Sequence, residues 1–122
     1  MTTLAQNVLG FESWQLNAQA KIMAVIKGES QITYHALAIA AQMTGPYKIH
    51  RLTLWLEESM VEDHRNGHPF RAAVVISKAR NGLPAPGFFE KANQLGLSFK
   101  TEDRTRQYQD YLQTVYASSQ SL

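Results

Sequence analysis

The tripeptide at residues 44–46, Thr-Gly-Pro, interrupts two helical patterns and constrains the fold more than any other feature of this chain. Before it, residues 34–43 form a short alanine-rich pattern, and Thr33 occupies the position of an N-cap. Gly45 can adopt the left-handed conformation that follows many helices, and Pro46 has the fixed φ that suits the start of the next one. The sequence therefore predicts two helices joined by a tight turn.

The helix predicted after this turn, residues 47–65, carries apolar side chains on two sides. The first set is spaced by three and four residues, as expected for a face turned to the core, and comprises Ile49, Leu52, Leu56 and Met60. The second set repeats every seven residues, with Trp55 beside it, and comprises Tyr47, Leu54 and Val61. A helix that is apolar on two sides is either covered by other helices or shared with a partner, and the sequence leaves both open.

Three further segments show helical periodicity. Residues 11–27 end at Gly28 and repeat apolar side chains at Trp14, Ala18, Ile22, Val25 and Ile26. Residues 88–95 predict a short helix, with Phe88 and Phe89 as an apolar plug, and residues 102–118 predict a C-terminal helix. We expect the tyrosines of this last helix to pack in the core against Trp14 and Phe11; they are Tyr108, Tyr111 and Tyr116.

Residues 70–87 predict a β-hairpin of the kind that forms a wing. Residues 70–77 are rich in valine and isoleucine, as in a strand, and Asn81-Gly82 is typical of a tight turn. Prolines in the return segment exclude a central strand there, and residues 31–32 predict one more short strand. The expected fold class is α+β and mainly helical, with a winged-helix-like core over residues 31–87 and helices added at both ends.

The length of 122 residues predicts a single domain over the whole chain, with residues 1–10 as a lead-in segment. Apolar residues make up 44% and charged residues 18%, which suffices for one core. The chain contains no cysteine, so disulfides, thiolate metal sites and a cysteine nucleophile are excluded. Because the sequence shows neither a signal peptide nor a membrane-spanning run, we expect a cytoplasmic protein.

Short motifs in residues 31–87 resemble the winged-helix domain of the alkyltransferase-like DNA-binding proteins. The resemblance rests on Gln31-Ile-Thr-Tyr-His-Ala-Leu-Ala, on Gly45-Pro-Tyr-Lys-Ile-His-Arg, and on the strand and glycine-containing loop that follow. In that family the Thr-Tyr-x-x-Leu-Ala segment begins the first helix of the pair, the next helix enters the minor groove, and a tyrosine and an arginine assist nucleotide flipping. The resemblance implies that Tyr34 corresponds to this tyrosine and Arg51 to this arginine.

The chain also departs from that family. Its catalytic members carry Pro-Cys-His-Arg-Val, whereas this chain reads Val74-Val-Ile-Ser-Lys78, and without cysteine it cannot accept an alkyl group. The segment over residues 73–89 looks like a bacterial variant of the winged domain, and the C-terminal helix lies outside the resemblance.

Basic side chains gather in two places of the predicted core. Lys48, His50 and Arg51 begin the second helix of the pair, and Lys78 and Arg80 lie at the tip of the wing. In a winged helix these two regions can contact the same duplex, so the leading hypothesis is a non-catalytic DNA-binding protein that also uses Tyr34. The formal net charge is only +2, and four acidic residues further along the helix would repel DNA unless they turn away: Glu57, Glu58, Glu62 and Asp63.

The alternative hypothesis is a protein–protein interaction or assembly module on the same scaffold, including self-association as a homodimer. Its candidate interface is the second apolar set of the long helix, Tyr47, Leu54, Trp55 and Val61. This surface overlaps the predicted DNA-reading surface, and one surface cannot serve both at the same time.

The sequence shows no catalytic motif: it has no phosphate-binding glycine loop, no paired catalytic carboxylates and no hydrolase elbow. Gly67 and Pro69 interrupt any helix between His64 and His68, so these histidines do not form a ligand pair on one helical face. We therefore expect neither an enzyme nor a metal, cofactor, membrane or small-molecule partner.

Overall fold

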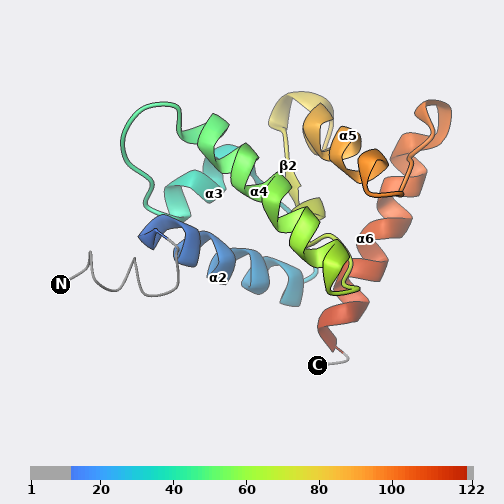
Figure 1. The fold of residues 1–122 in the computed structure, drawn as a ribbon, viewed down its shortest axis with the longest axis horizontal. Helices are drawn as coiled ribbons and strands as arrows, with labels where there is room; N and C mark the ends of the chain where they lie inside the picture. Colours follow the sequence, from blue (N-terminus) through green and yellow to red (C-terminus); the bar gives the residue numbers. More distant parts are fainter. Residues whose placement is uncertain (1–11, 121–122) are drawn as a thin grey trace.

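The computed structural model describes residues 12–120, and its fold is mainly helical (Figure 1). The α-helices in this range are α2 (Ser13–Lys27), α3 (Tyr34–Ala40), α4 (Lys48–Arg65), α5 (Pro86–Gln94) and α6 (Arg104–Gln120). The short elements are strands β1 (Ile32–Thr33) and β2 (Val75–Ile76) and the 3-10 helices η1 (Arg71–Val74), η2 (Lys78–Arg80) and η3 (Thr101–Asp103). The predicted lead-in, residues 1–10, lies outside the described residues.

The two strands form a parallel sheet, in which Ile32 lies opposite Val75 and Thr33 opposite Ile76. The predicted β-hairpin is therefore wrong, because β2 pairs with the segment that precedes α3 and not with a return strand. The return segment lacks donors for a ladder, since two of its residues are prolines. A single backbone hydrogen bond, from the Ser77 N–H to the Leu83 carbonyl at 2.9 Å, ties it to the end of β2.

Residues 70–77 are extended over a shorter stretch than their composition predicts. Arg71–Val74 closes into the 3-10 helix η1, which begins with a hydrogen bond from the Ala73 N–H to the Phe70 carbonyl at 3.1 Å. Only Val75–Ile76 remains as a strand, at the centre of the molecule between the helices. Burial explains the misleading composition, because residues 72–75 are apolar and buried whatever their backbone conformation.

The predicted start of α3 is confirmed, and its predicted end is wrong. The Thr33 hydroxyl accepts a hydrogen bond from the Ala36 N–H at 3.1 Å, as an N-cap does. The helix ends at Ala40 because Gln42, and not Gly45, takes the left-handed conformation that follows it, with φ of 60°. Gly45 is also left-handed, but it lies within the turn that leads to α4.

The core faces of α2 and α4 largely agree with their periodicity. All five apolar positions predicted for α2 are buried, and so are Leu52, Leu56 and Met60 on α4. Ile49 was predicted to share this face, but it is 42% exposed. The reason is its place in the first turn of α4, since residues 44 to 50 are all exposed in the described part of the chain.

Helix α6 is fixed to the rest of the chain by its tyrosines. The Tyr108 hydroxyl donates to the Ala73 carbonyl at 2.6 Å, and the Tyr111 hydroxyl accepts from the Phe70 N–H at 2.6 Å. The Tyr116 hydroxyl donates to the carbonyl of Ser30, just beyond α2, at 2.8 Å. These bonds join α6 to η1 and to the end of α2, so the C-terminal helix belongs to the same core.

The prediction that the tyrosines of α6 pack against Trp14 is wrong. Its tyrosine rings pack against Phe70, Phe89 and Phe99, with centroids 5.8 to 6.4 Å apart. Trp14 instead meets Trp55 of α4 edge-on, at a centroid distance of 5.6 Å, because it lies at the opposite end of α2 from Tyr116. Phe11 lies outside the described residues.

Asp63 near the end of α4 is fully buried and carries an ion pair with Arg71. Its carboxylate accepts hydrogen bonds from Nε and Nη2 of Arg71, the shortest at 2.7 Å, and from the Arg71 backbone N–H at 2.9 Å. This bidentate contact joins α4 to the start of η1.

We predict that Asp63→Ala destabilises the protein by about 3–5 kcal/mol, because it leaves the Arg71 guanidinium without its acceptor. Urea unfolding measures this loss. Glu62→Ala is the matched control, since Glu62 pairs with Arg65 at 3.0 Å on the surface, where a pair is worth about 0–1 kcal/mol. Equal losses of stability in the two variants would contradict the assignment of Asp63 as a structural anchor.

Candidate functional site

Leu54, the most exposed large apolar side chain of α4, lies on the face opposite the buried side of the helix. Leu54 is two residues from both Leu52 and Leu56, which places it about 200° around the helix from these core positions. It is 47% exposed, and Tyr47, the N-cap residue just before the helix with a left-handed φ of 57°, is 78% exposed. Val61, one heptad after Leu54, is partly exposed. We call the strip along Tyr47, Leu54 and Val61 the outward face of α4.

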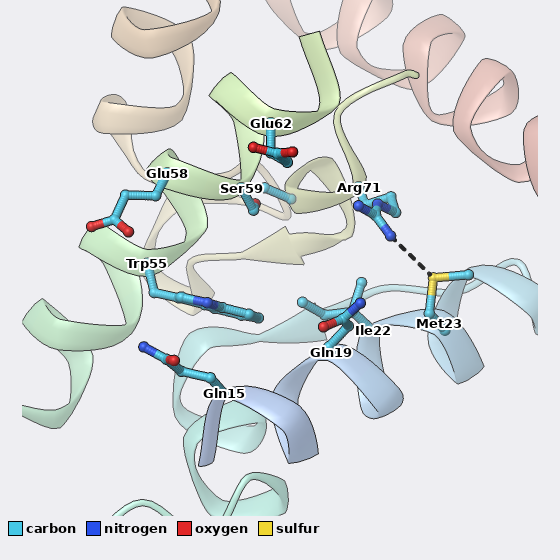
Figure 2. A pocket seen from close by; sticks show the side chains of 10 residues that line it. Gln15, Gln19, Ile22, Met23, Trp55, Glu58, Ser59, Glu62 and Arg71 are labelled. Atoms are coloured by element: carbon cyan, nitrogen blue, oxygen red, sulfur yellow. Dashed lines mark hydrogen bonds between the residues drawn. The ribbon is translucent and has the colours of Figure 1, made fainter. Parts of the chain in front are cut away.

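Trp55 was predicted to belong to this interface, but it turns toward α2. Its indole is half-buried against Trp14 and forms one end of a groove between α2 and α4 (Figure 2). The groove has a volume of about 380 Å³. Its lining residues are Gln15, Gln19, Ile22, Met23, Trp55, Glu58, Ser59, Glu62, Arg71 and Ala72.

Arg71 marks the other end of this groove in Figure 2. Its Nε and Nη2 atoms bind the buried Asp63, while Nη1 contacts the Met23 sulfur at 3.9 Å. Because the guanidinium is held by a buried carboxylate, its positive charge is largely compensated inside the protein. The groove therefore combines an apolar floor with amide and carboxylate side chains on its rim.

Arg51, one of the predicted nucleic-acid contacts, is engaged within the protein. Its Nη1 atom donates to the carbonyls of Thr44 and Pro46 at 2.8 and 3.2 Å, and its guanidinium lies 5.8 Å from the centre of the Trp14 ring. The side chain thus closes the turn between α3 and α4. A guanidinium used in this way is less able to reach a nucleic acid.

Tyr34, the second residue singled out by the resemblance, is also engaged. Its hydroxyl accepts a hydrogen bond from the Ala85 N–H at 3.0 Å, in the segment that leads into α5. Burial raises the pKa of the Tyr34 phenol above its ordinary value, and the hydrogen bond from Ala85 opposes this shift only in part. Tyr34 therefore fixes the segment after η2 to the start of α3.

The other four predicted nucleic-acid contacts are exposed: Lys48, His50, Lys78 and Arg80. Lys48 and His50 belong to the first turn of α4, where no side chain caps the helix and the first N–H groups have no partner within it. Lys78 and Arg80 lie on η2, directly after β2. The structure thus leaves two small basic groups on two separate elements.

The acidic residues of α4 differ in their surroundings. Glu57 lies against the start of α5, where a Cβ on Gly87 would be 2.6 Å from the Glu57 carboxylate. Glu58 is exposed beside the outward face, and among residues 12–120 it has neither an ion pair nor a hydrogen bond. Negative charge therefore accompanies the apolar strip beyond the first turn of the helix.

Sequence reasoning missed the buried role of Asp63 and its pairing with Arg71. A signal was present, because Asp63 follows Met60 by three residues and so continues the spacing of the core face. A charged residue at a core position requires a buried partner. The groove itself had no comparable signal, since it depends on the approach of α2 to α4 and η1.

Comparisons with protein-family models, curated proteins and solved structures found no match to this chain. Within residues 12–120, no helix combines the length and apolar character needed to cross a membrane. The same residues contain no group of three or more histidine, aspartate or glutamate side chains placed to hold a metal ion.

We predict that aspartate is tolerated on the outward face of α4 and not on its core face. Leu54→Asp should change the free energy of unfolding by less than about 1 kcal/mol, because position 54 is half exposed. Leu52→Asp should unfold the protein, because it places an unpaired carboxylate in the core. Thermal unfolding followed by circular dichroism compares the two, and equal destabilisation would show that Leu54 also belongs to the core.

Proposed function

We propose that this protein is a protein-interaction module that binds its partner through the outward face of α4. The observation that supports this proposal most directly is the exposure of Leu54, 47%, on the side of α4 opposite the core, together with that of Tyr47, 78%, at the N-cap of the helix. Such side chains gain from burial, and aromatic residues are enriched as anchors of protein interfaces.

The charges of α4 also favour a protein partner over DNA on this face. Beyond its first turn the exposed side of the helix carries Glu58, which has no ion pair within residues 12–120 and would repel a phosphate backbone. Arg51 keeps its positive charge, but hydrogen bonds to the carbonyls of Thr44 and Pro46 hold its guanidinium at the α3–α4 turn. An apolar strip with charged side chains beside it is the usual composition of a protein interface with a polar rim.

Site-specific photo-crosslinking tests this proposal. A photoreactive amino acid in place of Leu54 should give a protein adduct of discrete mass on irradiation in the expressing cells, because position 54 lies at the centre of the proposed interface. The same amino acid in place of Gln109, an exposed residue of α6, serves as the matched control.

A second substitution on the same face, Tyr47→Asp, should abolish the adduct formed from position 54 while the protein stays folded. The proposal fails if position 54 gives no adduct, if position 109 gives the same adducts, or if Tyr47→Asp leaves them unchanged.

Nucleic-acid binding is the second candidate function. It is favoured by the exposure of Lys48 and His50 beside the open N–H groups of the first turn of α4, and of Lys78 and Arg80 on η2. In a winged-helix-like interpretation, α3 and α4 would act as the helix-turn-helix and the η2 loop as the wing. Helix N-termini with basic side chains nearby are suited to phosphate groups.

Fluorescence anisotropy with labelled duplex DNA tests this second candidate. If it is correct, binding at about 50 mM salt should weaken at least tenfold at about 200 mM salt, since phosphate contacts depend steeply on salt. The double variant Lys48→Glu, Lys78→Glu should remove binding. Arg51 is unsuitable for charge reversal because it closes a turn. Lys21→Glu with Lys27→Glu on α2 is the control of equal charge, and an equal loss there would indicate only a general effect of net charge.

A further inference from the structure

We propose that the partner of the outward face is a second copy of this chain, with the two α4 helices packed antiparallel about a two-fold axis at Leu54. This inference rests on the proposed function and specifies its partner. In a two-fold pair of antiparallel helices, residues at equal distances before and after the axis face each other. A suitable face must therefore carry complementary side chains at equal distances before and after the axis.

The sequence of α4 has this property on its outward face. Leu54 would meet its own copy at the axis. Four residues before and after it stand His50 and Glu58, so a basic group would face a carboxylate. Val61, seven residues after Leu54, is partly exposed on the same side of α4, and the exposed Tyr47 stands at the N-cap, just outside the helix. Each contact away from the axis occurs twice, because the interface is symmetric.

The structure leaves these groups accessible. Leu54, His50, Glu58 and Tyr47 are exposed, and Glu58 has no ion pair or hydrogen bond within residues 12–120. Helix α4 runs across the middle of the molecule in Figure 1, with its buried side against the core. A second copy would therefore meet a helix that is already folded, and no helix-ordering cost opposes association.

Charge selects the antiparallel arrangement over the parallel one. The first turn of α4 carries Lys48 and His50, and its middle turns carry Glu57 and Glu58. Further along, Glu62 is paired with Arg65. A parallel pair would place the two basic first turns together and the carboxylates of the middle turns together. An antiparallel pair places the basic end of each helix against the acidic part of the other and also opposes the two helix dipoles.

Sedimentation velocity of the purified chain over a range of concentrations tests the inference. The unmodified protein should show a concentration-dependent dimer, and Leu54→Asp should be monomeric. His50→Glu places carboxylates opposite Glu58 at two symmetric sites and should weaken the dimer by about tenfold or more. Adding Glu58→Lys to this variant should restore the affinity, because each new glutamate then faces a lysine.

Glu102→Lys, on the exposed 3-10 helix η3, makes the same charge change as Glu58→Lys away from the face. Combined with His50→Glu it should restore nothing, which separates a facing pair from an effect of net charge. Circular dichroism of every variant verifies the fold. A protein that is monomeric at all concentrations, or a dimer that responds equally to both lysine substitutions, overturns the inference.

The crosslinking experiment distinguishes this failure from failure of the proposed function. An adduct from position 54 with twice the mass of the chain supports both. If position 54 gives an adduct with a different protein and the chain is monomeric in solution, the proposed interaction face stands and the homodimer is overturned. Absence of any adduct together with a monomeric chain overturns both.

Discussion

The ion pair between Asp63 and Arg71 decides how the long helix α4 meets the rest of the molecule. Asp63 is fully buried and accepts hydrogen bonds from both the side chain and the backbone of Arg71. It thereby fixes the first residue of η1, and η1 leads directly into β2, the strand that pairs with β1. A buried ion pair of this kind specifies one geometry more than it adds stability, because desolvation offsets much of its attraction. Asp63 lies on the inward side of α4 together with Leu52, Leu56 and Met60, and the opposite side is left outward.

The tyrosine hydroxyls of α6 complete the arrangement from the other side. Tyr108 and Tyr111 bind backbone groups of Ala73 and Phe70 at both ends of η1, and burial raises the pKa of Tyr111 to about 12. Each hydroxyl satisfies a backbone group that the short strands leave without a ladder partner. The C-terminal helix is therefore an integral part of the core, although the segment that carries the family resemblance ends before it. Two strands of two residues each suffice, because side-chain hydrogen bonds, and not a long strand ladder, connect α6 to η1 and to the end of α2.

Much of the fold could be predicted from the sequence, and the errors have a common physical cause. The helices followed from periodicity, since Trp14, Ala18 and Ile22 repeat on one face regardless of what they contact. The predicted hairpin was wrong, because apolar residues at 72–75 are equally compatible with a strand and with a buried 3-10 turn. Of the candidate sites, the helix period placed Leu54 on the side of α4 away from Leu52, but it left open whether other helices cover that side. The internal roles of Arg51 and Tyr34 could not, because their acceptor and donor lie in a turn and a loop whose paths depend on the complete fold.

These internal roles bear directly on which surface of α4 is free to act. In the resemblance to DNA-binding domains, Arg51 and Tyr34 are the residues that would reach a nucleic acid. In this structure they hold the α3–α4 turn and the segment before α5. What remains exposed on α4 is a short basic start followed by an apolar strip with carboxylates beside it. A helix that changes the sign of its charge along its length presents no uniform surface to a polyanion. Such a helix is complementary to a partner whose charges run in the opposite order, and a second α4 in reversed orientation has that order.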